Sequence, residues 1–190
     1  GTWAPGILDS TNEPPDVDMT AAWAATNLVP NPVFGVDIVG TAVSVNTSGL
    51  IKSGTAPNTS LRATSTAAGN SSWYPAGYDP GTSKFKAIRV TPGKRYRAQL
   101  RYQSPVGRNA FIQLRWMNDE GGLISVEASA TTGTTSGAWN LFAVAGVAPR
   151  NAAYASILIQ TNANTAGQVS YVDRVAIIEH DEDVDAFSGA

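Results

Sequence analysis

Residues 85–104 read FKAIRVTPGKRYRAQLRYQS and contain the clearest strand pattern of the chain. In the turn signal at 91–94, Pro92 fixes φ at the first corner, and Gly93 accepts the positive φ that a type II turn needs at the second. From residue 95 onward polar and apolar residues alternate, with Tyr96, Ala98, Leu100 and Tyr102 on the apolar side. A period of two is typical of a strand with one buried and one solvated face. The pattern predicts an antiparallel hairpin of 86–91 with 95–103, on a sheet with one polar face.

The composition of the 190 residues narrows the class of protein. Hydrophobic residues make up 43%, which is enough for a core, whereas charged residues make up only 15%. The formal net charge of -2 gives no reason to expect nucleic-acid binding. No apolar run approaches the ~20 residues of a membrane span, so we expect no membrane insertion. The absence of cysteine excludes disulfides and thiolate metal sites.

The distribution of strand and turn signals predicts an all-β domain. Turn residues separate nine candidate strands, and no sustained 3.6-residue period follows residue 27. The candidate strands are 42–45, 61–64, 86–91, 95–103, 110–117, 123–128, 140–147, 155–160 and 169–178. This pattern favours an antiparallel β-sandwich.

Three segments stand apart from the candidate strands. Residues 1–26 are interpreted as an irregular N-terminal arm or linker with one short helix at 18–25. Residues 181–190 are an acidic C-terminal tail. Residues 65–84 form the longest stretch without a strand signal, and we expect a functional loop there because it contains three large aromatic residues.

An ordered set of short motifs resembles the jelly-roll carbohydrate-binding modules of the family 4, 9 and 22 type. The motifs are NLVPNPVF at 27–34, VTPGKRY at 90–96, LRWMNDEGG at 114–122, Trp139, APRNAA at 148–153 and VSYVDRV at 169–175. The resemblance covers residues 27–180 and implies a β-sandwich of jelly-roll type. It also implies a glycan ligand on the concave sheet face or on the loops at its rim.

The opening motif, together with the closing FSGA at 187–190, also resembles minor tail proteins of phages that infect actinobacteria. This second resemblance implies a virion (phage tail) or extracellular location. It implies a cell-surface polysaccharide and other virion or tail proteins as partners.

A sugar site needs aromatic rings for the flat C–H faces, and amide or guanidinium groups for the hydroxyls. If the strands 95–103 and 110–117 pair, their polar faces form one patch for a carbohydrate. The rim of that patch would be supplied by the aromatic residues of the 65–84 loop, whereas Trp116 and Trp139 are interpreted as core residues. The candidate carbohydrate-binding residues are Arg97, Gln99, Arg101, Phe111, Gln113, Arg115, Trp73, Tyr74 and Tyr78.

The sequence gives little support for catalysis. His180 is the single histidine, and no nucleophile elbow, phosphate loop or zinc-protease motif is present. Asp119 and Glu120 lie in a Gly-rich turn, where acidic residues cap backbone amides. We therefore expect no enzyme activity and no catalytic residues.

No cofactor is required by this interpretation, and a structural calcium ion is left open. In the resembling modules a Glu after the opening motif joins an Asp near the last strand in a calcium site. Here Gly35 follows Phe34, whereas Asp173 is retained and Asp37 is a substitute ligand. Calcium needs six to eight oxygen ligands.

The favoured function is a non-catalytic, carbohydrate-binding-like module of a phage tail protein that contacts host glycans. One alternative is a purely structural tail or capsid component, in which the arm makes assembly contacts or the chain forms a homo-oligomer. Another alternative is a binding module appended to a secreted glycoside hydrolase.

Overall fold

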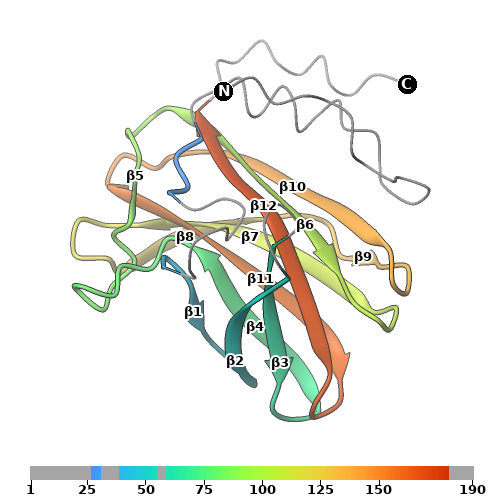
Figure 1. Ribbon diagram of the computed structural model, residues 1–190. Coiled ribbons are helices and arrows are strands. Elements are labelled where there is room, and N and C mark those ends of the chain that lie inside the picture. Colours follow the sequence, from blue (N-terminus) through green and yellow to red (C-terminus); the bar gives the residue numbers. More distant parts are fainter. Residues whose placement is uncertain (1–26, 31–38, 55–58, 180–190) are drawn as a thin grey trace, which may run out of the picture.

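The computed structural model describes residues 27–30, 39–54 and 59–179. They form twelve strands, and no helix that could cross a membrane occurs in these ranges (Figure 1). The strands are β1 (Ala42–Val43), β2 (Thr47–Ser53), β3 (Ser60–Ser65), β4 (Gly69–Ala76), β5 (Ile88–Arg89), β6 (Arg95–Gln103), β7 (Asn109–Met117), β8 (Leu123–Ala128), β9 (Thr132–Gly133), β10 (Trp139–Val147), β11 (Tyr154–Asn164) and β12 (Val169–Glu179). The expected arm, short helix and acidic tail, as well as Phe34, Gly35, Asp37 and His180, lie outside the described residues.

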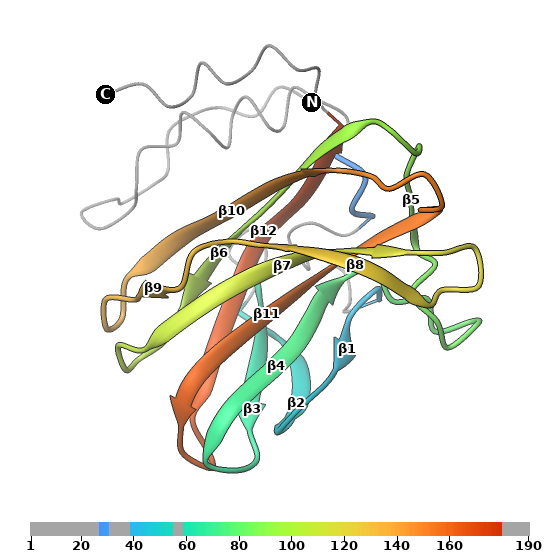
Figure 2. The same ribbon diagram turned by 180° about the vertical axis from the view of Figure 1, so that it is seen from behind.

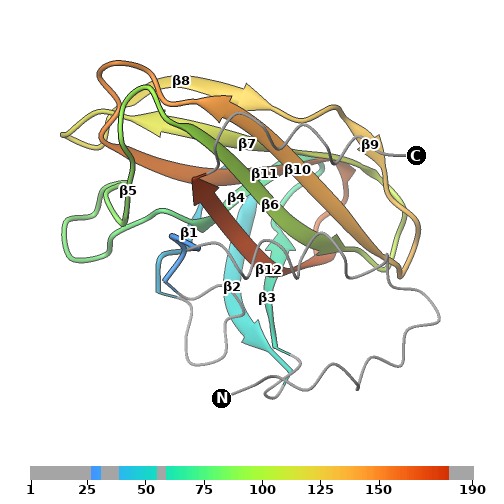
Figure 3. The same ribbon diagram turned by 90° about the horizontal axis from the view of Figure 1, so that it is seen from above.

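The strands form two packed antiparallel sheets, as expected for a β-sandwich. The five-stranded sheet has the order β10-β6-β12-β3-β2. The seven-stranded sheet has the order β1-β4-β11-β7-β8, with β5 paired to β11 and β9 paired to β7. Figure 1 shows the five-stranded sheet in front, and Figure 2 shows the other sheet from behind. Seen from above, β1 and β2 lie side by side at one edge of the sandwich (Figure 3).

The alternation predicted for residues 95–103 is confirmed along β6. Its apolar side chains are buried between the sheets, where Tyr96 meets Trp116 of β7 edge-on at a centroid distance of 5.8 Å. Tyr102 meets Phe142 of β10 in the same way, at 6.0 Å. Tyr96 and Trp116 come from opposite sheets and hold the layers together, whereas Tyr102 and Phe142 lie on neighbouring strands of the five-stranded sheet and fill its inner face.

The predicted hairpin of 86–91 with 95–103 is wrong. The turn itself forms, since the Lys94 amide donates to the Thr91 carbonyl at 3.2 Å and Gly93 has φ +80°. However, β5 pairs with β11 in the seven-stranded sheet, whereas β6 belongs to the five-stranded sheet. The turn is therefore a corner between the sheets.

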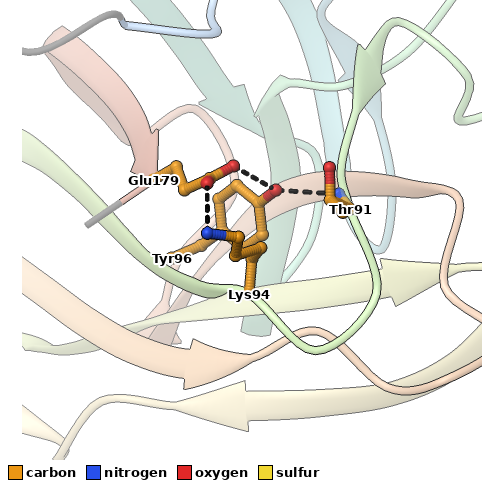
Figure 4. Close-up of polar contacts among 4 residues, drawn as sticks. All are labelled: Thr91, Lys94, Tyr96 and Glu179. Atoms are coloured by element: carbon orange, nitrogen blue, oxygen red, sulfur yellow. Dashed lines mark hydrogen bonds and ion pairs between the residues drawn. The ribbon is translucent and has the colours of Figure 1, made fainter. Parts of the chain in front are cut away.

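Two sets of bonds hold this corner in place. The Gly93 amide donates to the Ala148 carbonyl, and the Ala148 amide donates back to Lys94. On the other side the Tyr96 hydroxyl accepts a bond from the Thr91 amide at 2.8 Å (Figure 4). A corner of this kind satisfies its backbone polar groups without a partner strand.

The absence of a strand at 65–84 is also an expectation that the structure corrects. Residues 69–76 form β4, which lies between β1 and β11. Its serines hide the strand pattern because they are buried and internally satisfied. The Ser71 hydroxyl, for example, donates to the Asn46 carbonyl at 3.0 Å. The polar strand β2 was missed for a similar reason, since its sequence TSGLIKS shows no clear alternation.

The remaining strand predictions agree with the structure within a few residues, and β6 and β8 agree at both ends. The strand expected at 155–160 is longer, because β11 continues to Asn164. Of the opening motif, residues 27–30 are described, and Asn27 forms an isolated bridge with Ile178 of β12. This bridge joins the first residue of the motif to the last described strand of the chain.

Candidate functional site

The polar residues predicted on β6 do share one face. Arg97, Gln99 and Arg101 point away from the core, on the outer face of the five-stranded sheet, because their neighbours in the strand are buried between the sheets. Their accessibility differs, however. Gln99 is 1% exposed and Arg101 is 5% exposed, whereas Arg97 is partly exposed. Gln99 and Arg101 are therefore too buried to contact a ligand directly, and a ligand on this face would meet more exposed residues.

The polar residues predicted on β7 do not join this face. Phe111, Gln113 and Arg115 lie on the outer face of the seven-stranded sheet, where β7 pairs with β11 and β8. The single patch expected from pairing of 95–103 with 110–117 is wrong, because the 104–108 connection crosses from one sheet to the other. The outer faces of a sandwich point in opposite directions. The two sets therefore cannot contact the same sugar.

Of the three aromatic residues of the expected loop, Trp73 is separated from Tyr74 and Tyr78. Trp73 is 1% exposed and lies in the core beside Ile159, so it is not available to a ligand. Tyr74 lies on the outer face of the seven-stranded sheet and packs on Phe85 at a centroid distance of 4.3 Å. Tyr78 meets the other side of this group, 5.5 Å from Phe85. Tyr74 and Tyr78 thus stabilise their own loop.

Arg115 is held by this aromatic group. Its guanidinium stacks over the Tyr74 ring at 5.4 Å and donates a hydrogen bond to the Tyr74 hydroxyl. A guanidinium engaged in this way has fewer donors left for a ligand. The predicted residues of the seven-stranded sheet therefore form a packed surface around Tyr74, with Phe111 and Gln113 partly exposed beside it.

A different group of residues crosses the end of the five-stranded sheet. In the register of the strands, Gln103 of β6 lies opposite Trp139 of β10 on one side and opposite Tyr171 of β12 on the other. Tyr171 in turn lies opposite Arg62 of β3. Directly opposed residues point to the same face of a sheet. We call Trp139, Gln103, Tyr171 and Arg62 the outer row, and all four are partly exposed.

The geometry of the outer row suits an extended sugar chain. Neighbouring strands are ~4.8 Å apart, so Trp139 and Tyr171, two strands apart, have backbones roughly 10 Å from one another. That separation is about the length of two linked sugar rings. The two aromatic rings offer apolar faces, and Gln103 and Arg62 offer hydrogen-bond donors beside them.

Two charged residues, Arg101 and Asp173, support the outer row. Arg101 lies two residues before Gln103 on β6, and Asp173 lies two residues after Tyr171 on β12. The Arg101 guanidinium lies 5.1 Å from the centre of the Trp139 ring, a cation–π contact that fixes the indole. The same guanidinium pairs with the Asp173 carboxylate at 3.5 Å. Gln103 is oriented by a bond from its Nε2 to the Gly137 carbonyl at 2.6 Å. The outer row is therefore held in place by contacts within the sheet and with the connection between β9 and β10.

The similarity of this chain to known proteins is a similarity of fold. No family model matches the sequence, and no curated protein matches it. The CBM22-1 xylan-binding domain of Paenibacillus barcinonensis Xyn10C superposes with a TM-score of 0.56 at 10% identity, over 82% of this chain and 95% of that one. TmCBM61, solved with β-1,4-galactotriose, superposes with a TM-score of 0.51 at 14% identity, over 82% and 100%. The fold is the jelly roll of carbohydrate-binding modules.

The same jelly roll also matches parts of larger proteins. One is the enzymatically active domain of the tailspike protein 4 of bacteriophage CBA120, with a TM-score of 0.56 at 14% identity. This chain spans 21% of that protein, 26% of an α-L-arabinofuranosidase and 29% of a Clostridium thermocellum xylanase with a CBM22-1 module.

The two aromatic residues of the outer row were missed by the sequence reasoning for different reasons. Trp139 was assigned to the core, and this is wrong because the side chain is partly exposed on the outer face of the jelly roll. In WNLFAVAGV both faces of β10 are apolar, so alternation does not reveal the exposed side. The sequence around Tyr171 shows no clear alternation, because the polar Ser170 beside it is buried and Tyr171 itself is partly exposed.

Asp173, the acid retained from the calcium motif, is engaged with cations of the protein. Besides the contact with Arg101, its carboxylate accepts a bond from the Arg174 amide at 2.7 Å and lies 3.9 Å from the Arg174 guanidinium. Asp37 is outside the described residues. In the part of the jelly roll that the structure describes, no three His, Asp or Glu side chains form a metal-binding group.

Proposed function

We propose that this chain is a non-catalytic glycan-binding module and that the outer row is its sugar-contacting surface. The observation that carries the proposal is the alignment of Trp139 and Tyr171 on either side of Gln103, on the exposed face of a jelly-roll sandwich. Aromatic platforms flanking a polar group are the combination that a sugar ring needs. The xylan-binding domain and the galactotriose complex with the same fold support this assignment.

We further propose that the module belongs to a phage tail and contacts polysaccharides of the host cell surface. The opening motif at 27–34, the closing FSGA at 187–190 and the fold shared with a phage tailspike domain support this setting. A module joined to a secreted glycoside hydrolase is the alternative setting, and the arrangement of the CBM22-1 and GH10 modules in the xylanase supports it.

The test is a binding screen of the full-length protein against actinobacterial cell-wall polysaccharides, xylan and β-1,4-galactan. For the glycan that binds best, Trp139→Ala and Tyr171→Ala should each weaken binding about tenfold, as expected for ~1.4 kcal/mol of lost stacking. Phe111→Ala is the matched control, because this partly exposed ring lies on the opposite sheet. Absence of binding to every glycan, or an equal loss in the control, contradicts the proposal.

A second candidate function is assembly with other proteins, and the edge formed by β1 and β2 favours it. Val43 and Val45 are 53% and 57% exposed there, next to Val39 at 57% and Ile51 at 43%. Exposed edge strands with apolar side chains are prone to pair with other chains. Sedimentation over a concentration series tests this role: a concentration-dependent oligomer that Val43→Lys converts to a monomer supports it, and a monomer throughout contradicts it.

A further inference from the structure

We propose that the glycan recognised by the outer row is anionic, so that the module prefers polysaccharides with carboxylate or phosphate groups. The inference rests on the proposed function and names the class of ligand for the same surface. It follows from the distribution of charge in the chain, on the five-stranded sheet and beside the outer row.

Positive charge is concentrated in the described part of the chain. All 13 Lys and Arg residues lie within the described ranges, against six of the 15 Asp and Glu residues. The formal net charge of -2 for the whole chain therefore hides a basic sandwich. A surface of one sign raises the local concentration of ligands of the other sign.

The excess of positive over negative side chains is strong on the outer face of the five-stranded sheet. We call the arginines on this face the arginine face; they are Arg62, Arg95, Arg97, Arg101 and Arg174. Among the described residues on this face, Asp173 is the single acid, and its carboxylate serves both Arg101 and Arg174.

The other three arginines have no such compensation nearby. Within the described ranges, no carboxylate lies at ion-pair distance from Arg62, Arg95 or Arg97. All three are partly buried. Arg95 and Arg97 lie two residues apart on β6 and repel one another, whereas Arg62 lies opposite Tyr171, about 20 Å along the strands from Arg97. A partly desolvated guanidinium without a carboxylate partner favours an anionic ligand. Arg62 is itself a member of the outer row, so a carboxylate on a sugar lying along Tyr171 would meet this guanidinium directly.

The basic groups on the opposite sheet are arranged differently. Arg89 and Lys86 both lie over the ring of Tyr154, at 5.2 Å and 5.9 Å from its centre. Together with the stacked Arg115, these cations are engaged with aromatic rings of the protein. Arg89 therefore supplies a matched control, an arginine on a strand of the same sandwich that faces away from the outer row.

The experiment compares the binding of anionic polymers with that of matched neutral polymers. Affinity electrophoresis and calorimetry with the full-length protein measure both. The probes are polygalacturonate against its full methyl ester, and carboxymethyl-cellulose against hydroxyethyl-cellulose. We expect the anionic member of each pair to bind at least tenfold more tightly in about 10 mM salt, where the Debye length is about 30 Å. The ratio should fall toward one in about 150 mM salt, where it is about 8 Å.

Variants assign the preference to this surface. Arg62→Gln should weaken binding of the anionic polymers severalfold more than binding of the neutral polymers, because glutamine keeps hydrogen-bond donors but removes the charge. Arg97→Gln, at a residue outside the outer row, should reduce the preference by a smaller factor and leave binding of the neutral polymers unchanged, while Arg89→Gln should change neither. Trp139→Ala should weaken both members of a pair. Binding of the anionic polymers that keeps its full affinity in Trp139→Ala would be ion exchange by the sandwich as a whole and would overturn the inference.

Two further outcomes separate this inference from the proposed function. Equal binding of charged and neutral polymers overturns the anionic preference alone, whereas no binding to any of the four polymers or to the screened glycans overturns both. The competing hypothesis to test is binding of the acidic run at 181–185, which follows the end of β12 in the sequence and carries the charge that the arginine face attracts. A preference that emerges only when Asp181, Glu182, Asp183 and Asp185 are changed to amides assigns the face to the tail and overturns the inference for the native chain.

Discussion

The hydroxyl of Tyr96 donates a hydrogen bond to the carboxylate of Glu179 at 2.9 Å, which links β6 to the last residue of β12 (Figure 4). Tyr96 and Glu179 are directly opposed in the register of the two strands. The same hydroxyl accepts the Thr91 amide, and Lys94 approaches the other carboxylate oxygen at 3.5 Å. One buried phenol therefore joins the corner between the sheets to the end of the last strand.

Removal of this hydroxyl should destabilise the fold measurably. For Tyr96→Phe we expect the free energy of unfolding to fall by about 1–2 kcal/mol, because the lost bond goes to a charged but partly solvated acceptor. Tyr171→Phe is the matched control, since its partly exposed ring lies on the outer face and its change should stay within about 0.5 kcal/mol. Urea unfolding of the three proteins measures the difference. Equal losses for both variants would contradict a structural role for the Tyr96 bond.

The pH dependence of stability should identify the same group. Burial raises the pKa of Tyr96 above 10.0, the Thr91 amide lowers it, and the bond to Glu179 raises it. A raised pKa in the folded state gives a stabilisation that is complete below pH 10.0 and is lost as the pH rises through the folded-state pKa. The gap between the wild type and Tyr96→Phe should therefore shrink above pH 10.

Unfolding curves of both proteins at several pH values between 8 and 11 test this prediction. Burial also raises the pKa of Tyr102, but Tyr102 is present in both proteins and its effect cancels in the difference. A gap that stays constant or widens above pH 10 would show that the Tyr96 hydroxyl is not bound as the structure has it.

Local alternation predicted the side on which a residue lies, and it did so correctly along β6. It could not predict the neighbouring strand, because burial of Tyr96 and exposure of Arg97 are compatible with any partner. The single patch of β6 and β7 residues failed at this step, since it required a pairing that the corner at 91–94 and the crossing at 104–108 prevent. The outer row depends on three such pairings, so no single stretch of sequence contains it.

Composition is a poor guide to secondary structure where polar residues are buried. Ser71 and Ser72 in β4 are 0% and 4% exposed, although serine is typical of loops. Their hydroxyls are paired with neighbouring segments, as Ser71 is with Ser65 at 2.9 Å. A buried serine without its partner in view is indistinguishable from a loop residue, and for this reason Trp73 was assigned to a rim rather than to the core.

The two tryptophans whose locations were exchanged should respond oppositely to substitution. Trp73→Ala removes a ring that is 1% exposed, and we expect a loss of about 3–5 kcal/mol in the free energy of unfolding. Trp139→Ala removes a partly exposed ring and its contact with Arg101, with an expected loss of about 1 kcal/mol. Thermal and urea unfolding measure both. A well-folded Trp73→Ala protein that has lost glycan binding would restore Trp73 to the site.

Two glycines with nearly the same positive φ test how the 77–87 loop contacts the sheet. Gly77 has φ +105° and packs directly on β11, where an added Cβ would lie 2.4 Å from the Cβ of Ser156. Gly69 has φ +101°, and an added Cβ there would meet nothing within 4 Å. Gly69→Ala should therefore cost only the strain of a left-handed alanine, about 1–2 kcal/mol. Gly77→Ala adds an overpacking cost of about 1–3 kcal/mol or more.

The difference between the two variants reports the contact of the loop with the sheet, because both variants carry the strain of a positive φ. We expect Gly77→Ala to lose at least about 2 kcal/mol more than Gly69→Ala in urea unfolding, or to fail to fold while Gly69→Ala folds. The Tyr78 amide donates to Gly40 and the Ala87 amide donates to Gly77, so the loop moves with this residue. Equal stability of the two variants would mean that the loop does not rest on Ser156, and would reopen the surface around Tyr74 and Tyr78 as a ligand site.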